Sequence, residues 1–140
     1  MFTYSKTSKN RLQTATYNLQ KIFNFVGKRV NTTILDGYRG KIKQNKAYDE
    51  GRSRVQWPNG KHNTNPSKAV DALPYPIDWG EHGNSTQRRK AINRFYYFGG
   101  YVMGVAAVMG IKLRYGGDWD GDFDLHDQTF DDLVHFEEIE

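Results

Sequence analysis

The sequence of 140 residues contains no cysteine. Disulfide bonds, thiolate metal ligands and cysteine nucleophiles are therefore excluded, and any metal site must use histidine and carboxylate side chains. The chain also lacks a run of about 20 apolar residues, which is the length that a membrane-spanning helix needs. Its longest uncharged stretch, residues 95–111, contains four glycines and three tyrosines. This stretch predicts a buried helix and no insertion into a membrane.

The N-terminus shows no secretory signal. Residues 1–9 are polar, and no apolar segment with a small-residue cleavage site follows them. We therefore expect a soluble protein that is made in a cytoplasm.

Apolar material is sufficient for a core, because 37% of the residues are hydrophobic and 14% are aromatic. The length predicts one domain over residues 1–140, since a single core organises roughly 100–150 residues. Charge is distributed unevenly. Residues 1–100 carry 18 Lys and Arg against 6 Asp and Glu, whereas residues 101–140 carry 2 against 10. A basic region of this kind suits a polyanionic partner, either nucleic acid or an anionic cell-wall polymer.

Local patterns predict an α+β domain in which a small antiparallel sheet packs against helices. Apolar residues at three- and four-residue spacing predict a helix over residues 12–26 that ends at Gly27. Further helices are expected over residues 41–48 and 87–109, and short strands over residues 32–35, 69–73, 111–114 and 133–136. Two loops are expected, one rich in Gly, Asn, Pro and Ser over residues 50–66 and one rich in carboxylates over residues 116–128.

Histidines supply the candidate nitrogen ligands, and the chain has four: His62, His82, His126 and His135. His62 lies nine residues before Asp71, and His135 lies three residues after Asp132. Two imidazoles and a carboxylate are enough protein ligands for a catalytic zinc ion, and a further carboxylate can accept a proton from its water. The spacing alone is not specific, because the chain has no His-Glu-x-x-His motif and either aspartate could simply end a strand or cap a turn.

Three segments make the prediction of a zinc site more specific: Gly60-Lys61-His62, Ala69-Val70-Asp71 and Asp132-Leu133-Val134-His135. They resemble the LAS-type zinc peptidases of peptidoglycan, whose pattern is Ser-x-His, a short spacer, Ala-x-Asp and later Asp/Glu-x-x-His. That family includes the L-alanyl-D-glutamate endopeptidases of phage endolysins and the D-alanyl-D-alanine carboxypeptidases and dipeptidases. The resemblance covers about residues 34–137 and includes residues 36–39, Gln44, residues 51–54 and residues 114–120.

The resemblance implies a Hedgehog/DD-peptidase-like fold and three zinc ligands, which are His62, Asp71 and His135. It also implies that Asp132 is the general base and that Arg39 binds a carboxylate of the substrate. His82 and His126 match no ligand position of the family, so we expect neither to bind the metal.

The sequence departs from the family pattern at two points. Eight residues separate His62 from Asp71, where the family usually has six, and Gly60 stands where the family usually has serine. A loop can absorb two extra residues without changing the strand register at Asp71, and the serine is not a ligand. The predicted metal site is therefore retained.

The acidic loop offers a second candidate ion site. Its carboxylates alternate, as they do in calcium loops, at Asp118, Asp120, Asp122 and Asp124. The glycine expected at the sixth position is replaced by Phe123 or Leu125, depending on the starting residue, so the loop is not an EF-hand. It is either a solvated loop or a calcium site that orders the approach to the active site.

The expected function is a zinc endopeptidase that hydrolyses the L-Ala–D-Glu bond of peptidoglycan stem peptides. We expect a monomeric phage lysin without a separate cell-wall-binding domain, which accumulates in the host cytoplasm and reaches the wall through a holin pore. A D-Ala–D-Ala carboxypeptidase or dipeptidase would use the same ligands. A basic nucleic-acid-binding module is the alternative of another class, although no nucleic-acid-binding motif is present and we expect no such partner.

Overall fold

The computed structural model describes residues 1–140 and contains a four-stranded antiparallel sheet with strand order β1-β2-β4-β3. The elements, in chain order, are α1 (Lys6–Leu12), α2 (Tyr17–Arg29), β1 (Thr32–Asp36), α3 (Lys41–Asp49), the short 3₁₀ helix η1 (Lys61–Asn63), β2 (Ala69–Pro74), α4 (Ser85–Val108), β3 (Leu113–Tyr115) and β4 (His135–Glu138). The predicted α+β class with a small antiparallel sheet is confirmed.

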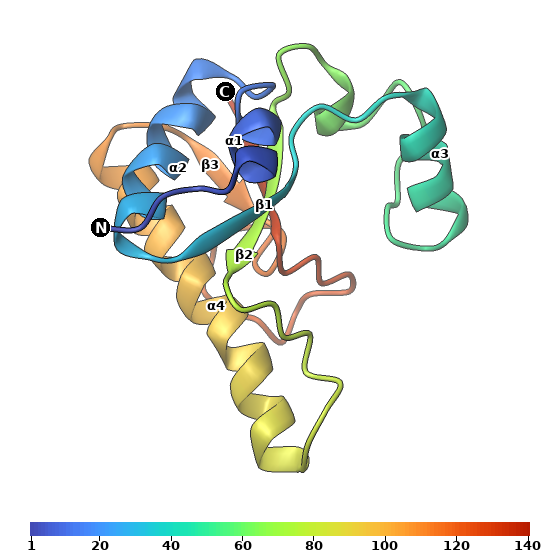
Figure 1. Cartoon of the computed structure of the whole chain (residues 1–140). Coiled ribbons are helices and arrows are strands. Elements are labelled where there is room, and N and C mark those ends of the chain that lie inside the picture. Colours follow the sequence, from blue (N-terminus) through green and yellow to red (C-terminus); the bar gives the residue numbers. More distant parts are fainter.

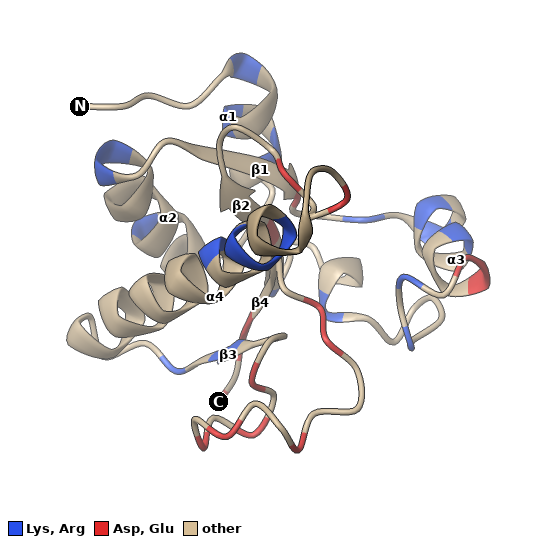
Figure 2. Cartoon of the chain, turned by 90° about the horizontal axis from the view of Figure 1, so that it is seen from below, with Lys and Arg blue, Asp and Glu red and all other residues tan.

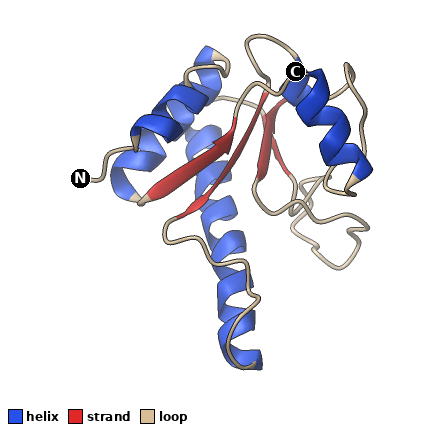
Figure 3. Ribbon diagram, turned by 45° about the vertical axis from the view of Figure 1, so that its right-hand side comes forward, coloured by secondary structure: helices blue, strands red, loops and turns tan.

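Helices α1, α2 and α4 lie on one side of the sheet, and α3 lies on the other (Figures 1 and 3). The core fills the first side. Phe136 of β4 lies at its centre, fully buried, with its ring 5.5 Å from that of Phe23, 6.1 Å from that of Phe98 and 4.8 Å from that of Tyr115. Burying a side chain of this size stabilises the fold by roughly 1.5–3 kcal/mol, so this cluster fixes the position of β4.

The inner strands β2 and β4 carry polar side chains on the face that points away from this core. Because successive side chains of a strand alternate between faces, Val70 and Phe136 enter the core while their neighbours Asp71, His135 and Glu137 point to the opposite side. Asp71 and His135 are paired directly across the two strands. The sheet therefore brings together two of the predicted ligands.

A bulge in β1 adds a further carboxylate to this polar face. Ile34 pairs with Ala72, but Asp36 pairs with Asp71, so two residues of β1 span one step of β2. A bulge shifts the alternation by one residue and redirects the following side chain. Asp36 therefore lies beside Asp71 and does not follow Ile34 into the core.

The first predicted helix differs from the structure. Residues 13–16 interrupt it, and Thr16 caps α2 by accepting a hydrogen bond from the Leu19 N–H at 3.3 Å. Gly27 lies inside α2 and does not end it. The ring of Tyr4 packs against this position and leaves no space for a Cβ atom, which accounts for the glycine. Helix α1 was not predicted, and the last strand begins at His135, two residues later than expected.

Helix α4 has 24 residues, and its N-terminal half projects away from the rest of the molecule (Figure 1). The structure contains no helix that combines the length and the apolar character needed to cross a membrane. Basic residues lie on α1, α2, α3 and the N-terminal half of α4, whereas several acidic residues lie on the loop between β3 and β4 (Figure 2). The basic and acidic residues, which are separated along the sequence, thus also lie in different parts of the structure.

Candidate metal centre and active site

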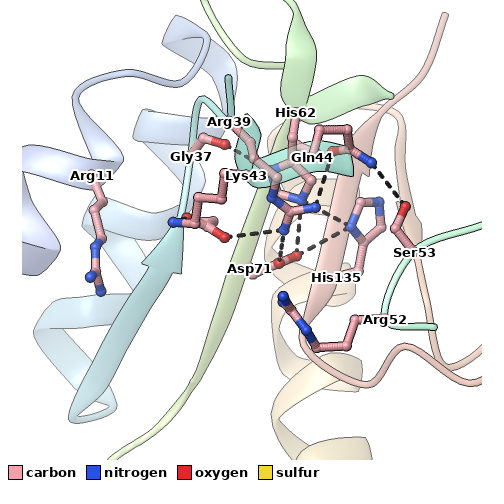
Figure 4. Close-up of polar contacts among 12 residues, drawn as sticks. Arg11, Gly37, Arg39, Lys43, Gln44, Arg52, Ser53, His62, Asp71 and His135 are labelled. Atoms are coloured by element: carbon pink, nitrogen blue, oxygen red, sulfur yellow. Dashed lines mark hydrogen bonds and ion pairs between the residues drawn. The ribbon is translucent and has the colours of Figure 1, made fainter. Parts of the chain in front are cut away.

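His62, Asp71 and His135 converge on the polar face of the sheet (Figure 4). His62 Nε2 lies 3.1 Å from Asp71 Oδ1 and 3.3 Å from His135 Nδ1, and the last two atoms are 3.2 Å apart. All three residues are buried. These atoms come from η1, β2 and β4, and together they can hold one metal ion. The long spacer between His62 and Asp71 is accommodated in the segment that joins η1 to β2.

Each of the three side chains is also held by a partner outside this triangle. His62 Nδ1–H donates to the carbonyl of Gly37 at 2.7 Å, and His135 Nε2 lies 2.9 Å from Glu137 Oε1. Asp71 Oδ2 accepts a hydrogen bond of 3.0 Å from Arg39. Such outer contacts fix the orientation of metal ligands and raise their affinity for the ion. The three side chains are therefore oriented before any ion binds.

Arg39 lies buried behind Asp71 and also lines the cavity described below. Its Nη2 donates to Asp36 at 3.1 Å and to Asp71 at 3.0 Å, and its Nη1 donates to Gln44 at 3.2 Å. Lys43 pairs with the other oxygen of Asp36. The guanidinium thus holds carboxylates of the chain itself, and its Nε is left without a protein partner.

Gln44 of α3 connects the segments around the site. Its Oε1 accepts hydrogen bonds from Arg39 and, at 3.1 Å, from Asn63, while its Nε2 donates to Ser53 at 3.0 Å and to the carbonyl of Val55 at 2.7 Å. All four hydrogen-bonding positions of this buried amide are used. Helix α3 is thereby joined to the loop that precedes η1.

The charges of the triangle depend on one another. Burial opposes the ionisation of Asp71, but the imidazoles of His62 and His135 hold its pKa well below the usual range. Burial likewise opposes protonation of His135, yet hydrogen bonds with Asp71 and Glu137 outweigh it and raise the pKa of His135 to about 10. A metal ion must therefore displace a proton from His135 when it binds.

Asp132 lies at the edge of the triangle, with its Oδ2 3.9 Å from His135 Nδ1. Burial, together with the charge of Asp71, raises its pKa to about 6. A carboxylate with a pKa near neutrality can both accept and return a proton. Its backbone is hydrogen-bonded to Gly116, where a Cβ atom would collide with the Asp132 carbonyl oxygen.

A cavity of about 600 Å³ is lined by Arg39, Gln44, His62, Asp132 and His135. One wall comes from the loop around residues 52–61, and the other comes from residues 127–130 with Trp119. Arg54 connects the walls, because its Nη2 donates to the carbonyl of Thr129 at 3.1 Å and its guanidinium lies 4.5 Å from the ring centre of Phe130. A cavity of this volume accommodates a short peptide segment. Its lining carries charges of both signs, with the cationic side chains Arg39, Arg52, Arg54 and Lys61 and the carboxylates Asp120, Asp127, Asp132 and Glu137.

Comparisons with known proteins agree with this geometry. Residues 1–139 match the family model described as phage L-alanyl-D-glutamate peptidase. The chain belongs to this family. It is 30% identical over 137 residues to the L-alanyl-D-glutamate peptidase of Escherichia phage T5, a match that covers 91% of this chain and 88% of that protein. Membership confirms the resemblance and favours a peptidase over a nucleic-acid-binding module.

The fold of this peptidase is also found in a solved structure. The crystal structure of the Serratia marcescens L-Ala D-Glu endopeptidase ChiX matches with a TM-score of 0.71, covering 98% of this chain and 90% of that chain. The two sequences are 18% identical, so this likeness establishes the shared fold alone.

In the acidic loop of the peptidase, carboxylate oxygens of Asp118, Asp120 and Asp122 lie close enough together to hold an ion. Asp124 does not belong to this group, and one of its oxygens accepts a hydrogen bond of 2.9 Å from the His126 N–H. His126 and His82 are exposed and take no part in the buried triangle.

Four groups at the site were missed by sequence reasoning: Asp36, the carbonyl of Gly37, Trp119 and Glu137. Glu137 follows His135 by two residues, so strand alternation could have placed it on the same face. The position of Asp36 depends on the bulge in β1, for which the sequence carries no signal. Trp119 reaches the site because its indole N–H donates to the carbonyl of Phe130 at 2.6 Å, a contact between distant parts of one loop.

Proposed function

We propose that this chain is a zinc-dependent endopeptidase that hydrolyses the L-Ala–D-Glu bond of peptidoglycan stem peptides. One observation carries the proposal: in a member of this peptidase family, His62 Nε2, Asp71 Oδ1 and His135 Nδ1 form a buried triangle beside Asp132. We further propose that the protein is a monomer that acts in lysis of the host and is released to the wall through a holin pore.

The dimensions of the triangle support zinc as the ion. Ligand atoms at roughly 2.0–2.1 Å from a tetrahedral zinc ion lie about 3.3 Å from one another, and the three edges measure 3.1, 3.2 and 3.3 Å. Two imidazoles and one carboxylate leave one position of the ion open, as in catalytic zinc sites. When bound, the ion supplies Lewis-acid activation of a water molecule and of the scissile carbonyl.

Asp132 would move the proton. It accepts a proton from the attacking water as the C–O bond forms at the L-Ala carbonyl, and it returns that proton to the amine of D-Glu as the C–N bond breaks. One water is consumed, and the products are an L-Ala carboxylate and a free D-Glu amine. A pKa of about 6 allows both transfers near neutral pH.

Arg39 would both hold the metal ligand Asp71 in place and bind the substrate. Its Nη2 holds Asp71 in place, and the residue also lines the cavity. A guanidinium at this position can bind a carboxylate of the stem peptide, which is the role expected from the sequence.

The test combines metal content with the identity of the bond that is cut. Purified wild-type protein, Asp132→Asn and the adjacent surface control Asp131→Asn are analysed for zinc by mass spectrometry and incubated with peptidoglycan sacculi. We expect about one zinc per chain in all three. New L-Ala carboxyl and D-Glu amino termini should be released by the wild type and by Asp131→Asn but not by Asp132→Asn.

Each other outcome has a defined meaning. Release of free D-Ala would assign the carboxypeptidase activity in place of the endopeptidase. Full hydrolysis by Asp132→Asn would remove the role of Asp132. A wild-type chain that binds DNA with a steep salt dependence and holds no zinc would overturn the proposal as a whole.

A further inference from the structure

Glu137 touches the metal centre without belonging to the triangle. Its Oε1 lies 2.9 Å from His135 Nε2, and its side chain is buried. His135 faces the triangle with its other nitrogen, Nδ1. A neutral imidazole carries one proton, so an Nδ1 that binds a metal requires the proton to be on Nε2. Glu137 is placed to accept that N–H.

We propose that Glu137 is a positioning residue that holds His135 in the Nε2–H tautomer and directs its Nδ1 lone pair at the metal. This inference rests on the proposed zinc site. It adds a fourth residue to that site, which acts through His135 and does not bind the ion.

The sheet explains why Glu137 can hold this position. His135 and Glu137 are two residues apart on β4, so their side chains lie on the same face, while Phe136 between them is locked in the core. Arg114 of β3 is paired directly opposite Glu137, and its Nη1 lies 3.5 Å from Glu137 Oε2. One carboxylate oxygen therefore faces Arg114 and the other faces the imidazole.

The two histidines differ in the kind of partner that orients them. His62 offers Nε2 to the triangle, and its Nδ1–H donates to the backbone carbonyl of Gly37. His135 offers the opposite nitrogen and therefore needs an acceptor on the opposite side of its ring. A backbone carbonyl cannot be removed by substitution, but a glutamate can, so the tautomer of His135 is open to a direct test.

The test compares Glu137→Gln and Glu137→Ala with the wild type and with Glu138→Ala. Gln keeps an oxygen that can accept the Nε2–H, whereas Ala does not. Glu138 is the matched control, because its oxygens accept hydrogen bonds of 2.7 Å from Thr16 and Asn18, away from the triangle. Zinc affinity is measured by competition with a chromophoric chelator, and the His135 tautomer by ¹⁵N NMR of the zinc-loaded proteins.

We expect Glu137→Ala to bind zinc roughly 10–100-fold more weakly than the wild type, as for other lost partners of metal-binding histidines. Glu137→Gln should retain most of the affinity and the Nε2–H signal, and Glu138→Ala should retain both fully. Unchanged affinity in Glu137→Ala, or equal weakening in Glu137→Ala and Glu137→Gln, would overturn the inference. A wild type that holds no zinc would overturn the proposed function as well, so the two failures are distinguishable.

Discussion

The buried triangle and the acidic loop both bring three metal-binding side chains within reach of one ion, yet they are built differently. The triangle draws its atoms from separate segments, and a partner outside the triangle orients each side chain. In the loop, the carboxylates accept hydrogen bonds from nearby backbone N–H groups, such as Phe123 to Asp118 at 3.0 Å and Asp124 to Asp122 at 2.8 Å. Both regions bring ligand atoms close together, but only in the triangle are the ligand side chains oriented by partners that include residues from other segments.

Because the triangle is buried and the loop is exposed, substitutions in the two regions should differ in their effect on the free energy of unfolding. Removing one partner of a buried charge pair leaves the other charge uncompensated and costs about 3–5 kcal/mol, whereas exposed charges on a loop contribute little. Substitutions at the triangle should therefore affect metal binding and folding together. Substitutions in the loop should affect neither unless an ion binds there.

The largest expected effect is that of Asp71→Ala. The substitution removes one atom of the triangle and a buried partner of Arg39. We expect no zinc and no hydrolysis, with a loss of about 3–5 kcal/mol in the free energy of unfolding. Zinc analysis and urea denaturation measure these effects. Asp120→Ala in the acidic loop is the control and should keep its zinc, and equal behaviour of the two variants would erase the contrast between the regions.

Gly116→Ala should impair proton transfer by Asp132 without removing the zinc ion. A Cβ atom at this position collides with the carbonyl oxygen of Asp132, so the segment that carries this carboxylate must move. A displacement near 1 Å can cost about 10²-fold in rate. We expect zinc content to be kept and kcat to fall by about that factor. Gly104→Ala in α4, where a Cβ meets open space, is the matched control and should leave kcat unchanged.

Competition between zinc and a proton for His135 should make zinc binding at the triangle depend on pH. The pKa of His135 is raised to about 10, so below that pH a proton must leave before zinc binds. Zinc affinity should rise about tenfold per pH unit, or about 100-fold between pH 6 and pH 8. Competition titrations over this range provide the measurement. A flat profile would show that His135 holds no proton in this range.

Arg39→Lys should have a smaller effect. A single ammonium cannot reproduce the planar fork that joins Asp36, Asp71 and Gln44. We expect the free energy of unfolding to fall by roughly 1.5–3 kcal/mol, the contribution of one hydrogen bond to a charged group. Urea denaturation measures it, and Arg52→Lys on the exposed loop serves as the control. An unchanged stability with a raised KM would instead assign Arg39 entirely to the substrate.

The smallest effect is expected in the acidic loop, which is either a solvated loop or a calcium site. Calcium at ten times its Kd would add about 1.4 kcal/mol to stability, which raises Tm by a few degrees in a protein of this size. The measurement uses zinc-saturated protein with and without calcium, and Asp122→Asn should abolish the shift. Identical melting curves would identify a solvated loop.

The sequence predicted more of the strands and ligand types than of their surroundings. The strand at residues 69–73 and the helices at residues 41–48 and 87–109 follow from local patterning, and the structure confirms them within a few residues. The break at residues 13–16 was missed because Leu12 and Ala15 are buried like helix residues, although tertiary contacts and not helical periodicity bury them. Local apolar spacing does not separate these two causes.

The predicted site residues followed from the resemblance to the peptidase family, but the contacts that orient them did not. Arg39 was expected to face the substrate, and its binding to Asp36 depends on a bulge that appears only when β1 and β2 are paired. The position of Glu137 beside His135 could have been predicted from strand alternation. Its role could not, because that depends on which nitrogen of His135 faces the triangle. Contacts of this kind depend on tertiary register.

The order of the strands has a consequence for the lifetime of a bound ion. Asp71 and His135 lie on β2 and β4, the two strands that are hydrogen-bonded on both sides. Fraying at either edge of the sheet leaves this pair intact, so a bound ion keeps two of its three protein ligands when the edge strands open. His62, the third ligand, lies outside the sheet on η1.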